Sequence, residues 1–197
     1  MVAQDSQAAD RVAGDPFGET RALVAIQNAI GEPGSGSSLA SVQRISRGMS
    51  HFGEHALGWF AVSAAGAAAD KPRRAEWLGV GVSAFIAHAA SVIIKRIVRR
   101  PRPHDPAIRI GVGTPSRLSF PSSHATSSTA ALVSMADLSG KKAPLAGIPA
   151  MGFSRLVLGV HYPSDVIVGT LIGLTTSKAV QKTIVPRLKQ RLSGRDA

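Results

Sequence analysis

The 197-residue chain contains no cysteine, which excludes disulfide bonds and thiolate metal sites. Aromatic residues make up only 5% of it, a poor supply for stacking on nucleic-acid bases. Acidic residues are also scarce, because 12 Asp and Glu stand against 23 Lys and Arg, for a net charge of +11. This balance favours an anionic membrane surface, and no nucleic-acid partner is expected.

The N-terminal quarter is predicted to precede the main domain. Residues 1–20 are polar and acidic and lack the basic start and apolar core of a secretory signal, so we expect a disordered polar tail. Over residues 21–53 apolar side chains recur at helical spacing, which predicts amphipathic helices. The second of them, over residues 39–51, either lies in a membrane interface with Arg44 and Arg47 toward headgroups or packs on a helical bundle.

Residues 54–182 hold five apolar blocks, at about 55–69, 77–94, 124–138, 144–160 and 166–179. Several are shorter than the roughly 20 residues that cross a bilayer unaided, so each alone also fits a buried helix of a soluble bundle. Basic clusters bracket the blocks, Trp59 and Trp77 fall near block ends, and small residues are abundant. We therefore predict an all-α polytopic membrane bundle of about five transmembrane helices, followed by a basic tail over 183–197.

The first chemical motif pairs Lys95 with Arg102, six residues further on. Lysine offers phosphate a compact charge and arginine a planar fork. The pair alone is equally consistent with a basic cluster at a membrane edge, and we assign Arg96, Arg99 and Arg100 to such an edge. His88, inside the second apolar block, is expected to be an ordinary packed helix residue.

The second motif is Pro121-Ser122-Ser123-His124, directly before an apolar block. Ser122 or Ser123 can cap the helix, and free N–H groups at a helix start attract anions. His124 would then lie in the first turn. When this motif stands alone, a capped helix with an incidental histidine is the better explanation.

The third motif runs from Ser154-Arg155 through His161 to Asp165. A lone charge such as Arg155 is costly inside an apolar block and is usually functional there. Asp165, four residues after His161, is placed to accept one ring N–H and leave the other nitrogen as a free lone pair. The alternative is an Arg155–Asp165 pair that ties helices together.

The order and spacing of the three motifs resemble the type 2 phosphatidic acid phosphatase superfamily, over roughly residues 95–165. Ser123 departs from the pattern, because the family usually has glycine there. The resemblance implies that His161 is the nucleophile, that Asp165 orients it and that His124 is the general acid and base. It also implies phosphate binding by Lys95, Arg102, Ser122, Ser123 and Arg155, without a metal or other cofactor.

The resemblance further implies a lipid phosphate as substrate. The short, alanine-rich chain is similar to small actinobacterial members of the family, which points to decaprenylphosphoryl-5-phosphoribose. Phosphatidylglycerophosphate, phosphatidic acid and prenyl diphosphate are the alternatives. Two other classes of protein remain as alternatives. The apolar blocks argue against a soluble vanadium haloperoxidase, and the retained histidines argue against a catalytically silent scaffold.

The predicted location is the cell membrane, with several passes and with membrane lipids as surroundings. With five spans, the N-terminus and the active loop share one side, because two spans lie between them. The polar N-terminal region favours a site that faces the cytoplasm. No residue pattern indicates an oligomeric state.

Overall fold

The computed structural model describes residue 15 and residues 17–31 and 37–194, with the side chains of residues 37–39 left out. All secondary structure in these ranges is helical, which confirms the predicted all-α class. The polar tail predicted over residues 1–20 lies mostly outside the described residues. The first helices are α2 (Thr20–Ile30) and α3 (Ser37–Gly53), as the apolar spacing predicted.

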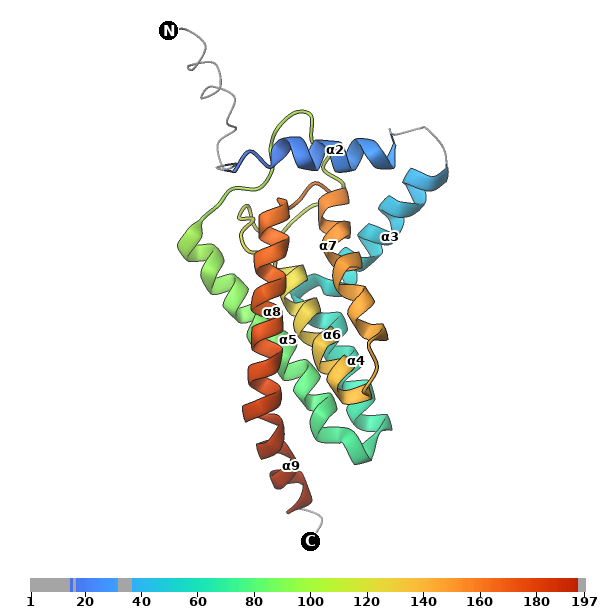
Figure 1. Ribbon diagram of the computed structural model, residues 1–197, viewed down its shortest axis with the longest axis vertical. Coiled ribbons are helices and arrows are strands. Elements are labelled where there is room, and N and C mark those ends of the chain that lie inside the picture. The colour runs from blue at the N-terminus through green and yellow to red at the C-terminus, as the bar shows by residue number, and fades with distance from the viewer. Residues whose placement is uncertain (1–14, 16, 32–36, 195–197) are drawn as a thin grey trace, which may run out of the picture.

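Five helices correspond to the five apolar blocks: α4 (Leu57–Ala69), α5 (Arg74–Val98), α6 (Ser123–Ser139), α7 (Gly147–Val157) and α8 (Pro163–Thr183). Three short 3-10 turns, Glu54–Ala56, Lys71–Arg73 and Ala143–Ala146, precede α4, α5 and α7. The predicted basic tail contains a further helix, α9 (Val185–Ser193), which continues the line of α8 (Figure 1).

Helix α6 lies at the centre of the bundle, and its residues 125–134 are all buried. Hydroxyl groups join it to its neighbours: Ser134 Oγ lies 3.0 Å from Ser83 Oγ of α5 and 2.9 Å from Ser177 Oγ of α8. Trp59 Nε1 of α4 donates to Ser128 Oγ at 3.0 Å. Such short polar links, among small side chains that allow close approach, are typical of helix packing in lipid.

Two glycines of α8 allow this helix to pack closely against α6. A Cβ atom placed on Gly173 would come within 2.4 Å of the Thr126 carbonyl oxygen, and one on Gly169 within 2.8 Å of the Ser122 carbonyl oxygen. No larger residue fits either position without moving the backbone. The glycines of α8 therefore determine how near the start of α6 lies to the start of α8.

Four helix ends meet at one end of the bundle: the C-terminal ends of α5 and α7 and the N-terminal ends of α6 and α8 (Figure 1). The loop over residues 99–122 covers this end, and α2 lies across it. Gln27 of α2 fastens the loop, because its amide donates to Arg109 O at 2.7 Å and accepts from Arg109 N at 2.9 Å. The polar N-terminal helix and the loop thus share one end of the molecule, opposite α9.

One helix of the described chain, within Lys71–Val98, is long and apolar enough to cross a membrane by length and composition. The other helices of the bundle are shorter or less apolar, as the block lengths predicted.

Candidate functional site

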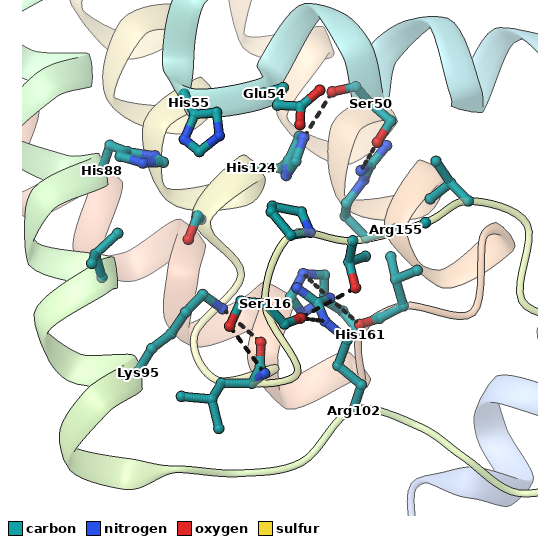
Figure 2. A pocket seen from close by; sticks show the side chains of 18 of the residues that line it. Ser50, Glu54, His55, His88, Lys95, Arg102, Ser116, His124, Arg155 and His161 are labelled. Atoms are coloured by element: carbon teal, nitrogen blue, oxygen red, sulfur yellow. Dashed lines mark hydrogen bonds between the residues drawn. The ribbon is translucent and has the colours of Figure 1, made fainter.

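A cavity of about 310 Å³ opens at the end of the bundle where the four helix ends meet. Six of the predicted functional residues line it: Lys95, Arg102, Ser123, His124, Arg155 and His161. Segments 66 residues apart in sequence therefore contribute to one pocket (Figure 2). The volume lies at the small end of the range found for ligand sites.

His161 stands between α7 and α8 with only 2% of its surface exposed. Its Nδ1 lies 3.4 Å from Asp165 Oδ2, and its Nε2 lies 3.2 Å from Arg102 Nη1. Because a guanidinium only donates, Nε2 must be the acceptor and Nδ1 must carry the proton. Burial, reinforced by the charges of Arg102 and Lys95, holds the pKa of His161 well below its ordinary value. The imidazole is therefore neutral, and the lone pair on its Nε2 faces Arg102 at the cavity.

Asp165 lies in the first turn of α8, where Pro163 occupies the first helical position. Its Oδ2 also accepts from the Tyr162 amide at 2.8 Å, which fixes the carboxylate at the helix start. The predicted link between Asp165 and His161 is present in the structure. The alternative pairing of Asp165 with Arg155 is not observed, because Asp165 binds a different arginine.

That arginine is Arg100, whose Nη1 lies 3.0 Å from Asp165 Oδ1. Arg100 is 7% exposed, and its guanidinium lies 4.1 Å from the centre of the Tyr162 ring. The assignment of Arg100 to a membrane edge is therefore wrong, whereas Arg96 and Arg99 are exposed. No signal in the basic run 95–100 distinguishes the buried arginine from its exposed neighbours.

Arg100 also contacts the segment before α2. Its Nη2 lies 2.8 Å from Glu19 Oε2, and the two Glu19 oxygens accept from the Ser164 amide and hydroxyl, both at 2.6 Å. Glu19 is thus joined to the start of α8, one residue before Asp165. The sequence offers no pattern for this contact, because Glu19 is 145 residues from Ser164.

Arg102 reaches into the cavity from the loop after α5. Its Nε donates to Ser116 O at 2.8 Å and its Nη1 to Val160 O at 2.7 Å. Burial, partly offset by Asp165, lowers the pKa of Arg102 from 12.5 to about 10, so it stays charged at neutral pH. The guanidinium is held beside Nε2 of His161, and its Nη2 makes no hydrogen bond within the described part of the chain.

Lys95 ends α5 at the edge of the cavity and is 7% exposed. Its ammonium donates to three backbone carbonyls, those of Leu118 at 3.3 Å, Ser119 at 2.8 Å and Pro121 at 2.6 Å. An ammonium has three donors, so all are engaged in holding the chain that leads into α6. Lys95 therefore adds positive charge to the cavity and also orders the second motif.

Ser122 is the N-cap of α6, with its side chain accepting from the Ala125 amide at 3.4 Å. Its own amide donates to Asp165 O at 2.9 Å, so that N–H is not available to a ligand. Ser123 is the member of the pair that lines the cavity. Its hydroxyl accepts from Ser91 Oγ of α5 at 2.8 Å.

His124 and Arg155 are both anchored by α3. His124 Nε2 lies 2.9 Å from Ser50 O, while Arg155 Nη1 donates to Ser50 Oγ at 2.9 Å and Nη2 to Ser46 O at 3.1 Å. Arg155 is 1% exposed and lies in the last turn of α7. The predicted amphipathic helix thus packs on the bundle, the second of its two alternatives, and supplies polar contacts that the motifs did not indicate.

Four cationic side chains line the cavity, Lys95, Arg96, Arg102 and Arg155, against one carboxylate, Glu54. A cavity of this charge favours a dianionic group such as phosphate. The neutral His161 nitrogen, a second histidine and convergent arginines together can perform phosphoryl transfer.

Residues 76–188, more than half of the chain, match the PAP2 superfamily. The chain therefore belongs to this superfamily, which confirms the predicted family and the predicted enzyme class, a phosphatase. It is 56% identical over 155 residues to the decaprenylphosphoryl-5-phosphoribose phosphatase of Mycolicibacterium smegmatis, covering 78% of this chain and 82% of the relative.

A second relative of the same name, from Mycobacterium tuberculosis, is 51% identical over 166 residues, covering 84% of this chain and 90% of the relative. Among solved structures, LpxE of Aquifex aeolicus aligns with a TM-score of 0.59 at 20% identity, covering 82% of this chain and 93% of that chain. At this identity the likeness concerns the fold alone.

Proposed function

We propose that this protein is a membrane lipid phosphatase that removes the 5-phosphate of decaprenylphosphoryl-5-phosphoribose and leaves decaprenylphosphoryl-ribose. The observation that carries the chemistry is the neutral His161, with Nδ1 directed at Asp165 and Nε2 3.2 Å from Arg102 in a cationic cavity. The assignment of this substrate rests on the relatives that are 51% and 56% identical over most of the chain.

In the proposed reaction His161 Nε2 attacks phosphorus and the bond to the ribose oxygen breaks. His124 protonates that oxygen, so the products of the first step are an alcohol and a phosphohistidine. Because Nε2 of His124 is bonded to Ser50 O, the proton is exchanged through Nδ1. In the second step His124 takes a proton from water, which attacks phosphorus and breaks the P–N bond.

Arg102, Arg155 and the Ser123 amide would hold the phosphoryl oxygens as charge develops on them. Lys95 contributes its charge while it fixes residues 118–121, and Ser122 caps the helix that carries His124. Asp165 keeps the proton on Nδ1 of His161 and stabilises the ring as it becomes positive.

The test is phosphate release by purified protein in detergent with EDTA present. Decaprenylphosphoryl-5-phosphoribose should be the best of a panel that includes phosphatidylglycerophosphate, phosphatidic acid and prenyl diphosphate. His161→Ala should fall to background, and wild-type enzyme quenched in alkaline denaturant should carry a phosphoryl group that is stable in alkali and released by acid. Full activity of His161→Ala would contradict the assignment of His161 as the nucleophile. A higher rate on another lipid of the panel would contradict the proposed substrate.

We further propose that α4 to α8 cross the cell membrane. Large apolar side chains are exposed on the outer faces of α5 and α8, among them Ile93 (60%), Ile97 (74%) and Ile167 (60%). A water-soluble bundle seldom exposes such a surface, whereas acyl chains cover it without cost. The protein should remain in the pellet after alkaline carbonate extraction of membranes, and its release would contradict the proposal.

The proposed orientation has the cavity facing the cytoplasm. Because the chain has no cysteine, single cysteines introduced at exposed Ala22 of α2 and exposed Ser193 of α9 report opposite ends of the molecule. An impermeant maleimide added to intact spheroplasts should label Ser193→Cys and spare Ala22→Cys. The reverse pattern would place the cavity outside.

A further inference from the structure

The cavity continues past the phosphate residues to a second polar group formed by Glu54, His55 and His88 (Figure 2). Glu54 and His55 belong to the turn between α3 and α4, whereas His88 belongs to α5. None of these three residues has a role in the phosphate chemistry described above. The expectation that His88 is an ordinary packed helix residue is wrong, because it lines the cavity.

His88 carries an unmet hydrogen-bonding capacity. Its Nδ1 is buried and has no partner in the described structure. It also lies within the helix of the described chain that is long and apolar enough to cross a membrane, where an unpaired polar group is costly and usually functional. The His88 ring stands 5.9 Å from the His55 ring, centre to centre.

The turn that carries the other two residues has an unusual backbone. His55 and Ala56 both adopt left-handed conformations, with φ of 50° and 60°. Non-glycine residues seldom do so, and such positions gather at ligand sites. The Glu54 carboxylate is half-buried and forms no hydrogen bond or ion pair with the residues that the structure describes. The Glu54 carboxylate therefore lines the cavity without a partner among the described residues, and the His88 ring lines it with its Nδ1 buried.

A metal ion is not the ligand that this group fits. Among the described residues, no set of three His, Asp or Glu side chains lies close enough to share one ion. A carboxylate and two imidazoles spread along one cavity wall instead suit the hydroxyl groups of a ligand, since each hydroxyl both donates and accepts.

The direction of phosphoryl transfer locates the alcohol part of the substrate. The leaving oxygen must lie on the side of phosphorus away from His161 and within reach of His124. In Figure 2, His124 lies between His161 and the group of Glu54, His55 and His88. Lys95 and His88 are seven residues apart on one face of α5, about 10 Å along its axis. One phosphorylated pentose ring has a length of that order.

We propose that Glu54, His55 and His88 form a sugar subsite that binds the vicinal hydroxyls of a pentose between the phosphate and the lipid. This deepens, and rests on, the proposed phosphatase function. Glu54 accepts from the two ring hydroxyls, and the His88 imidazole supplies a further hydrogen bond. The subsite selects phosphorylated sugar lipids over lipids whose phosphate is attached directly to glycerol or to a prenyl chain.

The experiment compares three substrates in detergent micelles: farnesylphosphoryl-5-phosphoribose, its 2-deoxyribose analogue and phosphatidic acid. Charge-assisted hydrogen bonds of this kind are worth about 10- to 100-fold in binding. Wild type should favour the ribose lipid over the deoxy analogue by about that factor in kcat/KM. Glu54→Gln should lose most of this preference, chiefly through KM for the ribose lipid.

His88→Leu should lower the ratio of the ribose lipid to phosphatidic acid, and His88→Asn should restore part of it because an amide replaces Nδ1. The matched control is Glu76→Gln, since Glu76 pairs with Lys189 away from the cavity and should leave both ratios unchanged. Equal losses on all three substrates, or unchanged ratios, would overturn the subsite. No phosphate release from any substrate by wild type would instead overturn the phosphatase function itself.

Discussion

Arg100 Nη1 lies 3.0 Å from Asp165 Oδ1, on the opposite side of the carboxylate from the His161 ring. The proposed nucleophile, His161, is therefore at one end of a chain of contacts that runs through Asp165 and Arg100 to Glu19. Each member is buried or nearly so, which strengthens the electrostatic coupling between them.

Removing the Arg100 charge should reduce catalysis without removing any group that touches phosphate. We expect Arg100→Met to lower kcat by about 10-fold or more, because the unpaired Asp165 carboxylate no longer holds His161 in place. Arg100→Lys should recover part of kcat, and KM should change little. Steady-state kinetics of both variants measures this, with exposed Arg99→Met as the control. A change confined to KM would contradict the positioning role.

Gly53 at the end of α3 leaves room for His124. A Cβ atom there would come within 2.6 Å of His124 Cδ2, so Gly53→Ala must displace the imidazole or the helix. We expect a loss of kcat of about 100-fold, the range typical of general acid–base groups. Gly48→Ala in the same helix meets no atom within 4 Å and should retain activity. Similar kinetics for both alanine variants would show that His124 is not confined in this way.

Gly173 controls the spacing of α6 and α8. Gly173→Ala should lower the free energy of unfolding by about 1–3 kcal/mol, because the methyl group meets the backbone at Thr126 rather than a flexible side chain. Thermal unfolding in detergent measures the loss, with the exposed Thr175→Ala of the same helix as a control. An unchanged melting temperature would mean that the two helices separate easily at this point.

Acid should destabilise the folded protein through His161. Its pKa is lowered on folding, so the unfolded chain binds a proton below its pKa of about 6.5 while the folded chain does not. Stability is therefore fully present above that pH and falls as the pH drops, by up to about 1.4 kcal/mol per unit from this residue. His161→Asn should flatten the dependence of melting temperature on pH between 7 and 5. Exposed His104→Asn should leave it unchanged.

Local sequence patterns predicted the helices well because each apolar block is bounded by proline, glycine or charge. The links between His161 and Asp165 and between Ser122 and the start of α6 were also predictable, since they depend on separations of three or four residues. Arg100 and Ser50 were not, because their roles depend on contacts made across the fold. Composition also could not distinguish Arg100 from Arg99, since only the end of α5 turns one of them inward.

Glu19 and Ser50 precede residue 76, where the match to the superfamily begins. Glu19 nevertheless binds the start of α8, and Ser50 holds both His124 and Arg155. We therefore expect the smallest active piece of this protein to be larger than the segment that matches the family, residues 76–188. A chain that starts at α5 would keep all three sequence motifs and still lack the contacts from α3 that hold His124 and Arg155.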